Sequence, residues 1–367
     1  MAEPLATVAA ILRNAIADHA FPAAAIELGR SDGLLWRDVY GTLSYETDAP
    51  EATPDTIFDL ASLTKVIATA TLAMRAVDDS RLHLEDPVRR WLPEWRGADR
   101  EQVTVRDLLT HSSGLSAYLP LYRDYTGRQE FQRAICDLPL EYAPRSQSIY
   151  SDLGFILLGF ILEDAQPASA SFHGAAGTLD PSTRLPSQFQ RLATFITSDP
   201  LAFNPPRAWR DRTAPTELDP WRGRVLVAEV HDENAWALGG AAGHAGLFGT
   251  VGAVGAFART VLRTLAGDRV LAQPDTMRLF MQKSDVPGSS RALGWDTVLP
   301  TSSCGGRLSS SSIGHTGFTG TSLWIDWERD LYIVLLTNRV HPTRTNESIR
   351  QIRPRVHDAV IAEIAGA

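Results

Sequence analysis

The stretch that most constrains this protein is residues 59–77, which read DLASLTKVIATATLAMRAV. Apolar residues recur at helical spacing from Val66 to Val77, so the segment predicts a helix with one apolar face. Ser62 and Lys65 are three positions apart at the start of this helix, where side chains three apart are neighbours on one face. A lysine amine at this position can therefore reach the serine hydroxyl.

This Ser-x-x-Lys arrangement suits acyl transfer. A serine hydroxyl is a poor nucleophile unless a base takes its proton, and the unpaired N–H groups at a helix start favour a developing oxyanion. The tetrapeptide alone is weak evidence, because serine also caps ordinary surface helices and lysine decorates them. Further elements have to agree with it.

Two such elements follow in the chain. Tyr150-Ser151-Asp152 stands directly before the apolar run 153–162, which predicts a buried helix. His315-Thr316-Gly317 stands directly before a pair of predicted strands. Their order and rough separation are those of a three-element serine site.

Together these elements resemble the active-site motifs of class C β-lactamases and their relatives, the penicillin-binding D,D-peptidases, D-aminopeptidases and family VIII esterases. The stretches 56–62, 105–115 and 246–248 are also similar, so the resemblance spans nearly the whole chain. It implies an α+β fold of the β-lactamase/transpeptidase type and a serine hydrolase that acts through an acyl-enzyme.

The resemblance also implies roles for particular residues. Ser62 would be acylated, Lys65 and Tyr150 would handle its proton, and the backbone N–H groups of Ser62 and Phe318 would form the oxyanion hole. Tyr150 needs a depressed pKa to act as the base, and Lys65 is the nearby cation to supply it. The expected substrate-binding residues are Asp152, His315, Thr316 and Gly317.

Two positions depart from the usual pattern of this family. His315 replaces the commoner lysine, and a histidine is largely neutral at pH 7, so we expect weaker anchoring of a substrate carboxylate. Asp152 replaces the commoner asparagine, which exchanges an amide donor for an anion. Both changes indicate weak β-lactamase activity at most, and favour a neutral ester or a D-amino-acid peptide as substrate. They also fit an alternative, a non-catalytic protein of the same fold that binds a peptidoglycan-like ligand.

The two ends of the chain mirror each other. A predicted helix and hairpin begin the chain, and a predicted hairpin and helix end it. We therefore expect one antiparallel sheet built from both ends and flanked by the terminal helices, with a mostly helical lobe inserted between them. The expected ranges are 1–58 and 291–367 for the sheet lobe, 59–290 for the inserted lobe, and 166–187 for a flexible surface excursion within it.

Composition restricts the partners. The net charge of −8, the pI near 5.6 and the lack of a basic run argue against nucleic acid, so we expect a small-molecule ester, amide or peptide substrate. The first residues have no basic n-region, which predicts a cytoplasmic protein. The apolar run 153–162 is about half of the roughly 20 residues that a membrane-spanning helix needs, so no membrane span is expected.

Cysteines and histidines give no metal signature. Cys136 and Cys304 have no CxxC or histidine neighbours at ligand spacing, so we predict two unpaired thiols, no metal and no cofactor. His231 and His244 lie in an unusual stretch rich in glycine, alanine and acidic residues. They either line the pocket or are loop histidines held by backbone groups.

A rival motif occurs near the start of the chain. Residues 29–33 read GRSDG and match the G-x-S-x-G pattern of α/β-hydrolases, with Ser31 as nucleophile. That pattern requires a strand before the serine and a helix after it. Here Asp32-Gly33 is a hairpin-turn signal and residues 34–40 are strand-like, so we reject this interpretation.

Overall fold

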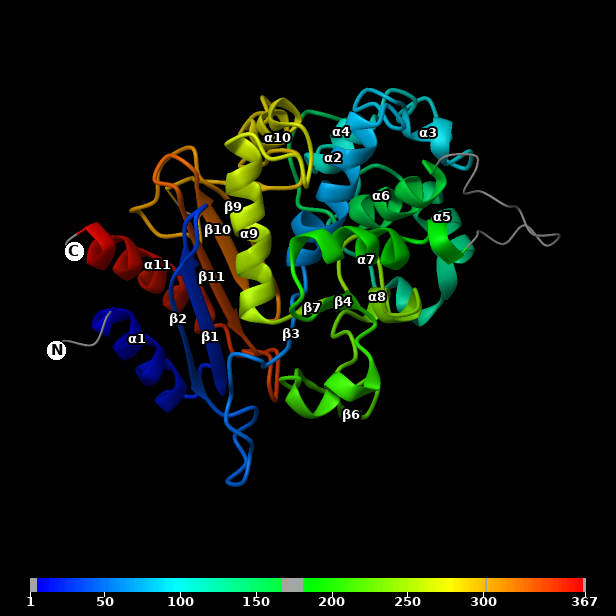
Figure 1. Cartoon of the computed structure of the whole chain (residues 1–367). Coiled ribbons are helices and arrows are strands. Elements are labelled where there is room, and N and C mark those ends of the chain that lie inside the picture. Colours follow the sequence, from blue (N-terminus) through cyan, green and yellow to red (C-terminus); the bar gives the residue numbers. More distant parts are fainter. Residues whose placement is uncertain (1–4, 167–180, 301, 366–367) are drawn as a thin grey trace.

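The computed structural model describes residues 5–166, 181–300 and 302–365. A six-stranded antiparallel sheet forms one side of the molecule, and most of the helices form the other (Figure 1). The strand order is β2-β1-β11-β10-β9-β8. The strands are β1 (Ala23–Gly29), β2 (Leu34–Gly41), β8 (Asp296–Thr297), β9 (Ile313–Thr316), β10 (Ser322–Asp326) and β11 (Leu331–Thr337).

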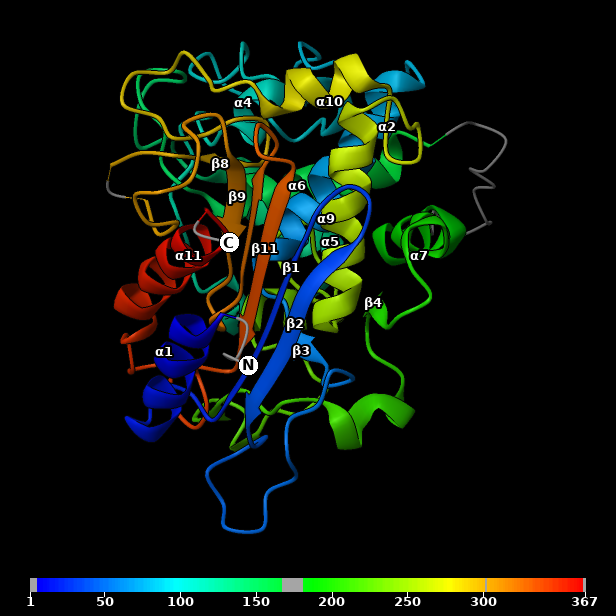
Figure 2. The same ribbon diagram turned by 60° about the vertical axis from the view of Figure 1, so that its left-hand side comes forward.

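The two ends of the chain meet in the centre of this sheet. Strand β1 pairs antiparallel with β11, and β10 with both β11 and β9. The antiparallel sheet predicted from the mirrored ends is therefore confirmed, and Figure 2 shows its strands running side by side. The division into lobes at residues 58/59 and 290/291 remains a prediction.

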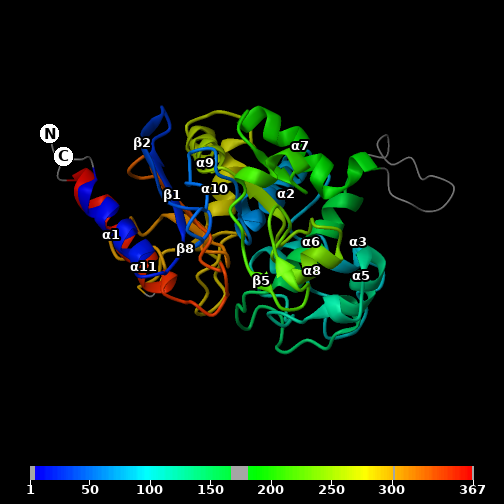
Figure 3. The same cartoon turned by 90° about the horizontal axis from the view of Figure 1, so that it is seen from below.

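Both faces of the sheet are covered, and every residue of β11 is buried. Leu331, Ile333 and Leu335 face a core shared with α1 (Ala6–Ala17) and α11 (Ile349–Ala365). Tyr332, Val334 and Leu336 point to the opposite core, as the period of two in a strand requires. The terminal helices cover one face, as expected, while α9 (Val251–Leu265) from the middle of the chain covers the other (Figure 3).

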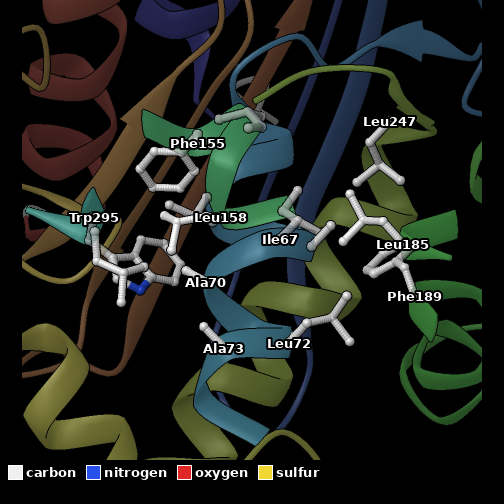
Figure 4. Close-up of a cluster of buried hydrophobic side chains, with 14 of the residues drawn as sticks. Ile67, Ala70, Leu72, Ala73, Phe155, Leu158, Leu185, Phe189, Leu247 and Trp295 are labelled. Atoms are coloured by element: carbon white, nitrogen blue, oxygen red, sulfur yellow. The ribbon is translucent and has the colours of Figure 1, made fainter. Parts of the chain in front are cut away.

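The helical part is organised around two buried segments. One is α6 (Asp152–Asp164), in which all ten residues of the apolar run 153–162 are buried. The other begins as a π-helix, Lys65–Ala70, and continues as α2 (Thr71–Asp78), where a continuous α-helix was predicted. Figure 4 shows Ile67 and Ala70 of this segment beside Phe155 and Leu158. A helix buried on nearly all sides forms a rigid support for the residues at its start.

Shorter elements complete the chain. The other α-helices are α3 (Val88–Trp91), α4 (Val105–Leu109), α5 (Gly127–Asp137), α7 (Leu185–Ile196), α8 (Glu233–Ala237) and α10 (Pro274–Met281). Short 3₁₀ helices occupy Leu121–Arg123, Pro181–Thr183 and Arg207–Arg212. A three-stranded sheet has the order β3 (Phe58–Asp59), β7 (Leu247–Gly249), β4 (Leu201–Phe203), and a separate pair is β5 (Leu218–Asp219) with β6 (Arg224–Val225).

The expected excursion at 166–187 needs a correction. Residues 167–180 lie outside the described part of the chain, but helix α7 already begins at Leu185. The side chains of Leu185 and Phe189 are buried in the main core (Figure 4). The last residues of the predicted excursion therefore belong to a helix that packs on the core. The proline and serine residues there indicated a loop, but the apolar residues at helical spacing already begin at Leu185.

The structure also describes the two cysteines and the lengths of the apolar helices. Cys136 and Cys304 are free and buried, which confirms two unpaired thiols. Among the helices of the described residues, none is both long and apolar enough to cross a membrane.

Candidate active site

Ser62 lies in a tight turn between β3 and the π-helix. Asp59 Oδ1 accepts a hydrogen bond from the Ala61 amide at 2.8 Å, and the Leu60 amide donates to the Leu247 carbonyl at 2.9 Å. Ala61 has a φ of 46°, a left-handed conformation that an alanine adopts only when its surroundings hold it there. The turn is therefore fixed on both sides before the chain reaches the serine.

Lys65 is fully buried behind Ser62, and three acceptors surround its ammonium group. Its Nζ lies 2.9 Å from Ser62 Oγ, 2.7 Å from Asp152 Oδ1 and 3.2 Å from the carbonyl oxygen of His244. The spacing of Ser62 and Lys65 thus brings the two side chains together as predicted, and α6 supplies the aspartate.

Tyr150 precedes α6 and completes the cluster. Its hydroxyl is hydrogen-bonded to both Ser62 and Lys65, and the lysine Nζ lies 4.7 Å from the centre of its ring. The rings of His111 and His315 lie 4.7 and 5.7 Å from the Tyr150 ring, centre to centre. The following residue is fixed as well, because the Ser151 amide donates to His111 Nδ1 at 3.0 Å.

The pKa of Tyr150 differs from the one expected from the sequence. Burial raises the pKa of its phenol above 10, although Lys65 opposes the shift, so the predicted depression of this pKa is wrong. Burial would lower the pKa of Lys65, but Asp152 and then Tyr150 raise it above 10.5. The resting pair is therefore a lysine ammonium and a neutral phenol.

The third element lies at the end of β9. The Gly317 amide donates to the Thr321 carbonyl at 2.8 Å, and a Cβ at Gly317 would meet Thr321 Oγ1 at 2.1 Å and the Leu60 carbonyl oxygen at 2.7 Å. Only glycine allows this close approach to the turn before Ser62. His315 is buried and its Nδ1 lies 2.8 Å from the Thr316 carbonyl oxygen. Burial and the nearby Arg291 hold its pKa well below 6.5, so the ring is neutral, as expected.

These residues line one pocket of about 610 Å³. Its wall includes the predicted residues Ser62, Tyr150, Asp152, His315, Thr316, Gly317 and Phe318, with Lys65 enclosed behind Ser62. The structure thus brings every predicted site residue to a single place. The functional roles given to them remain proposals.

The sequence analysis missed several arginines in the pocket wall. Arg291, Arg350 and Arg353 come from the loop before β8 and from α11. Arg353 is buried, donates to the Thr321 carbonyl at 3.1 Å, and has no carboxylate within 4.0 Å in the described part of the chain. Burial lowers its pKa to about 9, which leaves it charged at pH 7. No short motif contains these residues, so only the tertiary structure reveals them.

These arginines change the expectation about carboxylate anchoring. The histidine at position 315 carries no charge, but Arg291 stands 4.9 Å above the Tyr150 ring and Arg353 lines the same pocket. The pocket therefore contains guanidinium groups, charged at pH 7, that the comparison of motifs did not count. Their position suits an anionic group on the substrate.

His231 and His244 have different places. His231 lines the pocket, and its Nε2 lies 2.9 Å from Glu217 Oε2. His244 is buried outside the pocket wall, with Nε2 2.7 Å from Asp232 Oδ1. Only His231 therefore lines the pocket. Both rings contact carboxylates, whereas the alternative in the sequence analysis was contact with backbone groups.

The rival nucleophile lies elsewhere. Ser31 is in the turn between β1 and β2, and its hydroxyl donates to Asp330 Oδ2 at 2.8 Å. A hairpin turn lacks the helix that a nucleophile elbow requires, so the α/β-hydrolase interpretation is excluded.

Comparisons with known proteins agree with this geometry. Putative D-alanyl-D-alanine carboxypeptidases are similar, one from Escherichia coli K12 at 28% identity over 88% of this chain and 80% of its own, and one from Salmonella gallinarum at 29% over 81% and 73%. EstCE1, a hydrolase with promiscuous acyltransferase activity, has a similar fold, with a TM-score of 0.74 at 22% identity over 98% of both chains. So has a penicillin-binding protein homologue from Caulobacter crescentus, with a TM-score of 0.74 at 19% identity over 99% of this chain and 98% of its own.

A family model described as Beta-lactamase matches residues 8–356, which is nearly the whole chain. The α+β fold and the three clustered motifs are those that the resemblance implied. The chain belongs to the β-lactamase family and is a serine hydrolase of the β-lactamase and penicillin-binding-protein type.

Proposed function

We propose that this protein hydrolyses a peptide bond next to a D-amino acid that carries a free carboxylate, through an acyl-enzyme on Ser62. The observation that carries this proposal is the pair of hydrogen bonds that Lys65 Nζ makes to Ser62 Oγ and Asp152 Oδ1, in a pocket that also contains unpaired arginine charge. A pure binding protein has no need of a lysine aimed at a serine hydroxyl.

In this mechanism Ser62 Oγ attacks the substrate carbonyl and its proton passes to the Lys65–Tyr150 pair. The backbone N–H groups of Ser62 and Phe318 stabilise the oxyanion, and Tyr150 then returns a proton to the leaving amine. Water hydrolyses the acyl-Ser62 ester by the same proton path in reverse. Because the phenol starts protonated, Tyr150 takes up the serine proton only as its own proton moves toward solvent or substrate.

The choice of substrate rests on charge. Arg291 stands above the Tyr150 ring, where the leaving group receives its proton, and Arg353 lines the same pocket. A carboxylate on the leaving group would be stabilised by these charges. The names of the curated relatives, putative D-alanyl-D-alanine carboxypeptidases, support the same class. This leads us to favour a peptide over a neutral ester, and to retain the expectation of weak β-lactamase activity.

The test compares the wild type with Ser62→Ala and with Ser31→Ala, a matched serine outside the pocket. Release of D-alanine from a peptide ending in D-Ala-D-Ala is measured beside hydrolysis of p-nitrophenyl acetate and nitrocefin. We expect D-alanine release to fall by at least roughly a thousandfold in Ser62→Ala and to be unchanged in Ser31→Ala. Turnover retained by Ser62→Ala would overturn the mechanism.

Two other results separate the remaining possibilities. Ester turnover that depends on Ser62, without D-alanine release, would leave the mechanism intact and replace the substrate by an ester. Failure of a fluorophosphonate probe to label the folded wild type would favour the non-catalytic binding protein.

A further inference from the structure

Arg339 is a buried cation just after β11 that bonds to carbonyl oxygens rather than to carboxylates. Its Nε donates to the Phe318 carbonyl at 2.7 Å, and its Nη1 donates to the carbonyls of Arg344 and Asn346, each at 2.9 Å. Within the ranges that the structure describes, it makes no salt bridge. Burial lowers the pKa of Arg339, because the charged guanidinium loses contact with water in this place.

The same guanidinium also holds the side chain of Phe318. Its Cζ lies 4.5 Å from the centre of the Phe318 ring, and the His231 ring stacks with that ring at 5.6 Å and 27°. Half of the phenylalanine surface is nevertheless exposed, so packing by itself holds the ring only in part. Arg339 therefore restrains both the carbonyl and the ring of one residue.

The turn that contains Phe318 is hydrogen-bonded, through residues that follow Phe318, to the segment before Ser62. Thr319 Oγ1 donates to the Asp59 carbonyl at 2.7 Å, and Thr321 Oγ1 donates to the Leu60 carbonyl at 3.0 Å. Gly320 has a φ of 109°, and a Cβ there would lie 2.7 Å from Arg339 Cγ. The turn is shaped to let the arginine stem pass. At Phe318 itself the restraints come from Arg339, from the His231 ring and from Arg344, whose Cζ lies 5.9 Å from the centre of the Phe318 ring.

We propose that Arg339 is a positioning residue for the oxyanion hole. The inference rests on the proposed function, in which the Phe318 N–H is one of the two oxyanion donors. Because Arg339 binds the carbonyl and the ring of Phe318, it limits rotation of that residue and keeps the N–H directed at the position of the oxyanion. Arg339 binds the Phe318 carbonyl and two further carbonyls on the following segment. This requires the rigid fork of donors that a guanidinium has and a lysine lacks.

The experiment compares the hydrolysis of an ester with that of its thionoester, in which sulfur replaces the carbonyl oxygen. Sulfur is a weak hydrogen-bond acceptor, so the thionoester gains little from a well-placed N–H. We expect Arg339→Lys to lower kcat for the ester roughly tenfold to a hundredfold. This effect is no larger than the effect of removing one oxyanion donor completely. The KM is expected to change much less, and the ester-to-thionoester rate ratio falls with kcat.

The control is Arg355→Lys, an exposed arginine of α11 outside the pocket, for which both rates stay at wild-type values. The ratio of two rates on one preparation does not depend on the folded fraction, so a partly unfolded variant is still informative. If Arg339→Lys gives no folded protein, Arg339→Gln provides the same ratio with a neutral donor.

Two results would overturn the inference. One is an equal fall of ester and thionoester rates, which indicates a merely structural loss, and the other is a rise in KM alone. Turnover of the ester by Ser62→Ala would instead show that the proposed function has failed. An inactive Ser62→Ala with an unchanged ratio in Arg339→Lys rejects only the role of Arg339.

Discussion

Lys65 and Asp152 are 87 positions apart in the chain and form an ion pair of 2.7 Å between Nζ and Oδ1. The lysine side chain is fully buried and the aspartate side chain is 19% exposed. Asparagine, the commoner residue of the resembled motif at this position, is neutral and would not provide Lys65 with a counter-ion. The carboxylate of Asp152 therefore stabilises the charged form of Lys65 beside Ser62.

The first prediction concerns this pair. Since the pKa of Lys65 and that of Tyr150 both lie above their ordinary values, kcat/KM of the wild type should keep rising with pH into the alkaline range. Asp152→Asn removes the carboxylate that raises the Lys65 pKa, so the rising limb should move to lower pH. Asp124→Asn, an exposed carboxylate outside the pocket, serves as control, and an unmoved limb in Asp152→Asn would contradict the account.

The second prediction concerns Arg353 and the substrate carboxylate. Arg353→Gln should lower kcat/KM for a peptide with a free terminal carboxylate by roughly tenfold to a hundredfold, the value of a charged hydrogen bond, and change its carboxamide analogue much less. The preference of the wild type for the carboxylate should also decline above pH 9, because the Arg353 pKa is about 9. Equal losses for both peptides would show that Arg353 has only a packing role.

The third prediction concerns acid stability. Burial lowers the pKa of His357 from 6.5 to about 3, so the folded protein holds this ring neutral. The unfolded chain takes up a proton as the pH falls below 6.5, and the free energy of unfolding should decrease by about 1 kcal/mol per pH unit from this group between pH 6.5 and 3. Above pH 6.5 the group has no effect.

Urea unfolding at several pH values measures this slope. His357→Gln should unfold with a shallower decline between pH 6.5 and 4, whereas His83→Gln, at an exposed position, should match the wild type. A His357→Gln slope identical to that of the wild type would show that other groups, such as the buried His111 and His315, cause the whole decline.

The fourth prediction concerns the polar cluster between the sheet and α9. The carboxylate of Glu27 is fully buried and bonds to Arg37 Nε at 2.7 Å, Arg259 Nη1 at 3.1 Å and the Tyr332 hydroxyl at 2.7 Å. Glu27→Gln should lower the free energy of unfolding by about 3 kcal/mol, since two arginines lose their counter-ion. Glu51→Gln, at an exposed position, should differ little, and a fully stable Glu27→Gln would refute the importance of this cluster.

Periodicity predicted the elements well where they are long and apolar. The apolar run 153–162 predicted a buried helix, and α6 contains this run with one more residue before it and two after it. Patterns of this kind succeed because a strand buried on both faces or a helix with one apolar face leaves few other ways to remove its side chains from water. The π-helix at Lys65–Ala70 has no comparable sequence signal, since π-turns depend on contacts along the helix.

The site divides in a similar way. By itself the sequence determined the three motifs, the family they resemble and the reach of Lys65 to Ser62, because residues three apart on a helix are neighbours in any fold. Only the tertiary structure decided that Asp152 is the partner of Lys65, that burial raises the pKa of Tyr150, and that Arg353 and Arg339 join the pocket. These properties depend on burial and on contacts between distant segments, and neither is encoded in the spacing of a short motif.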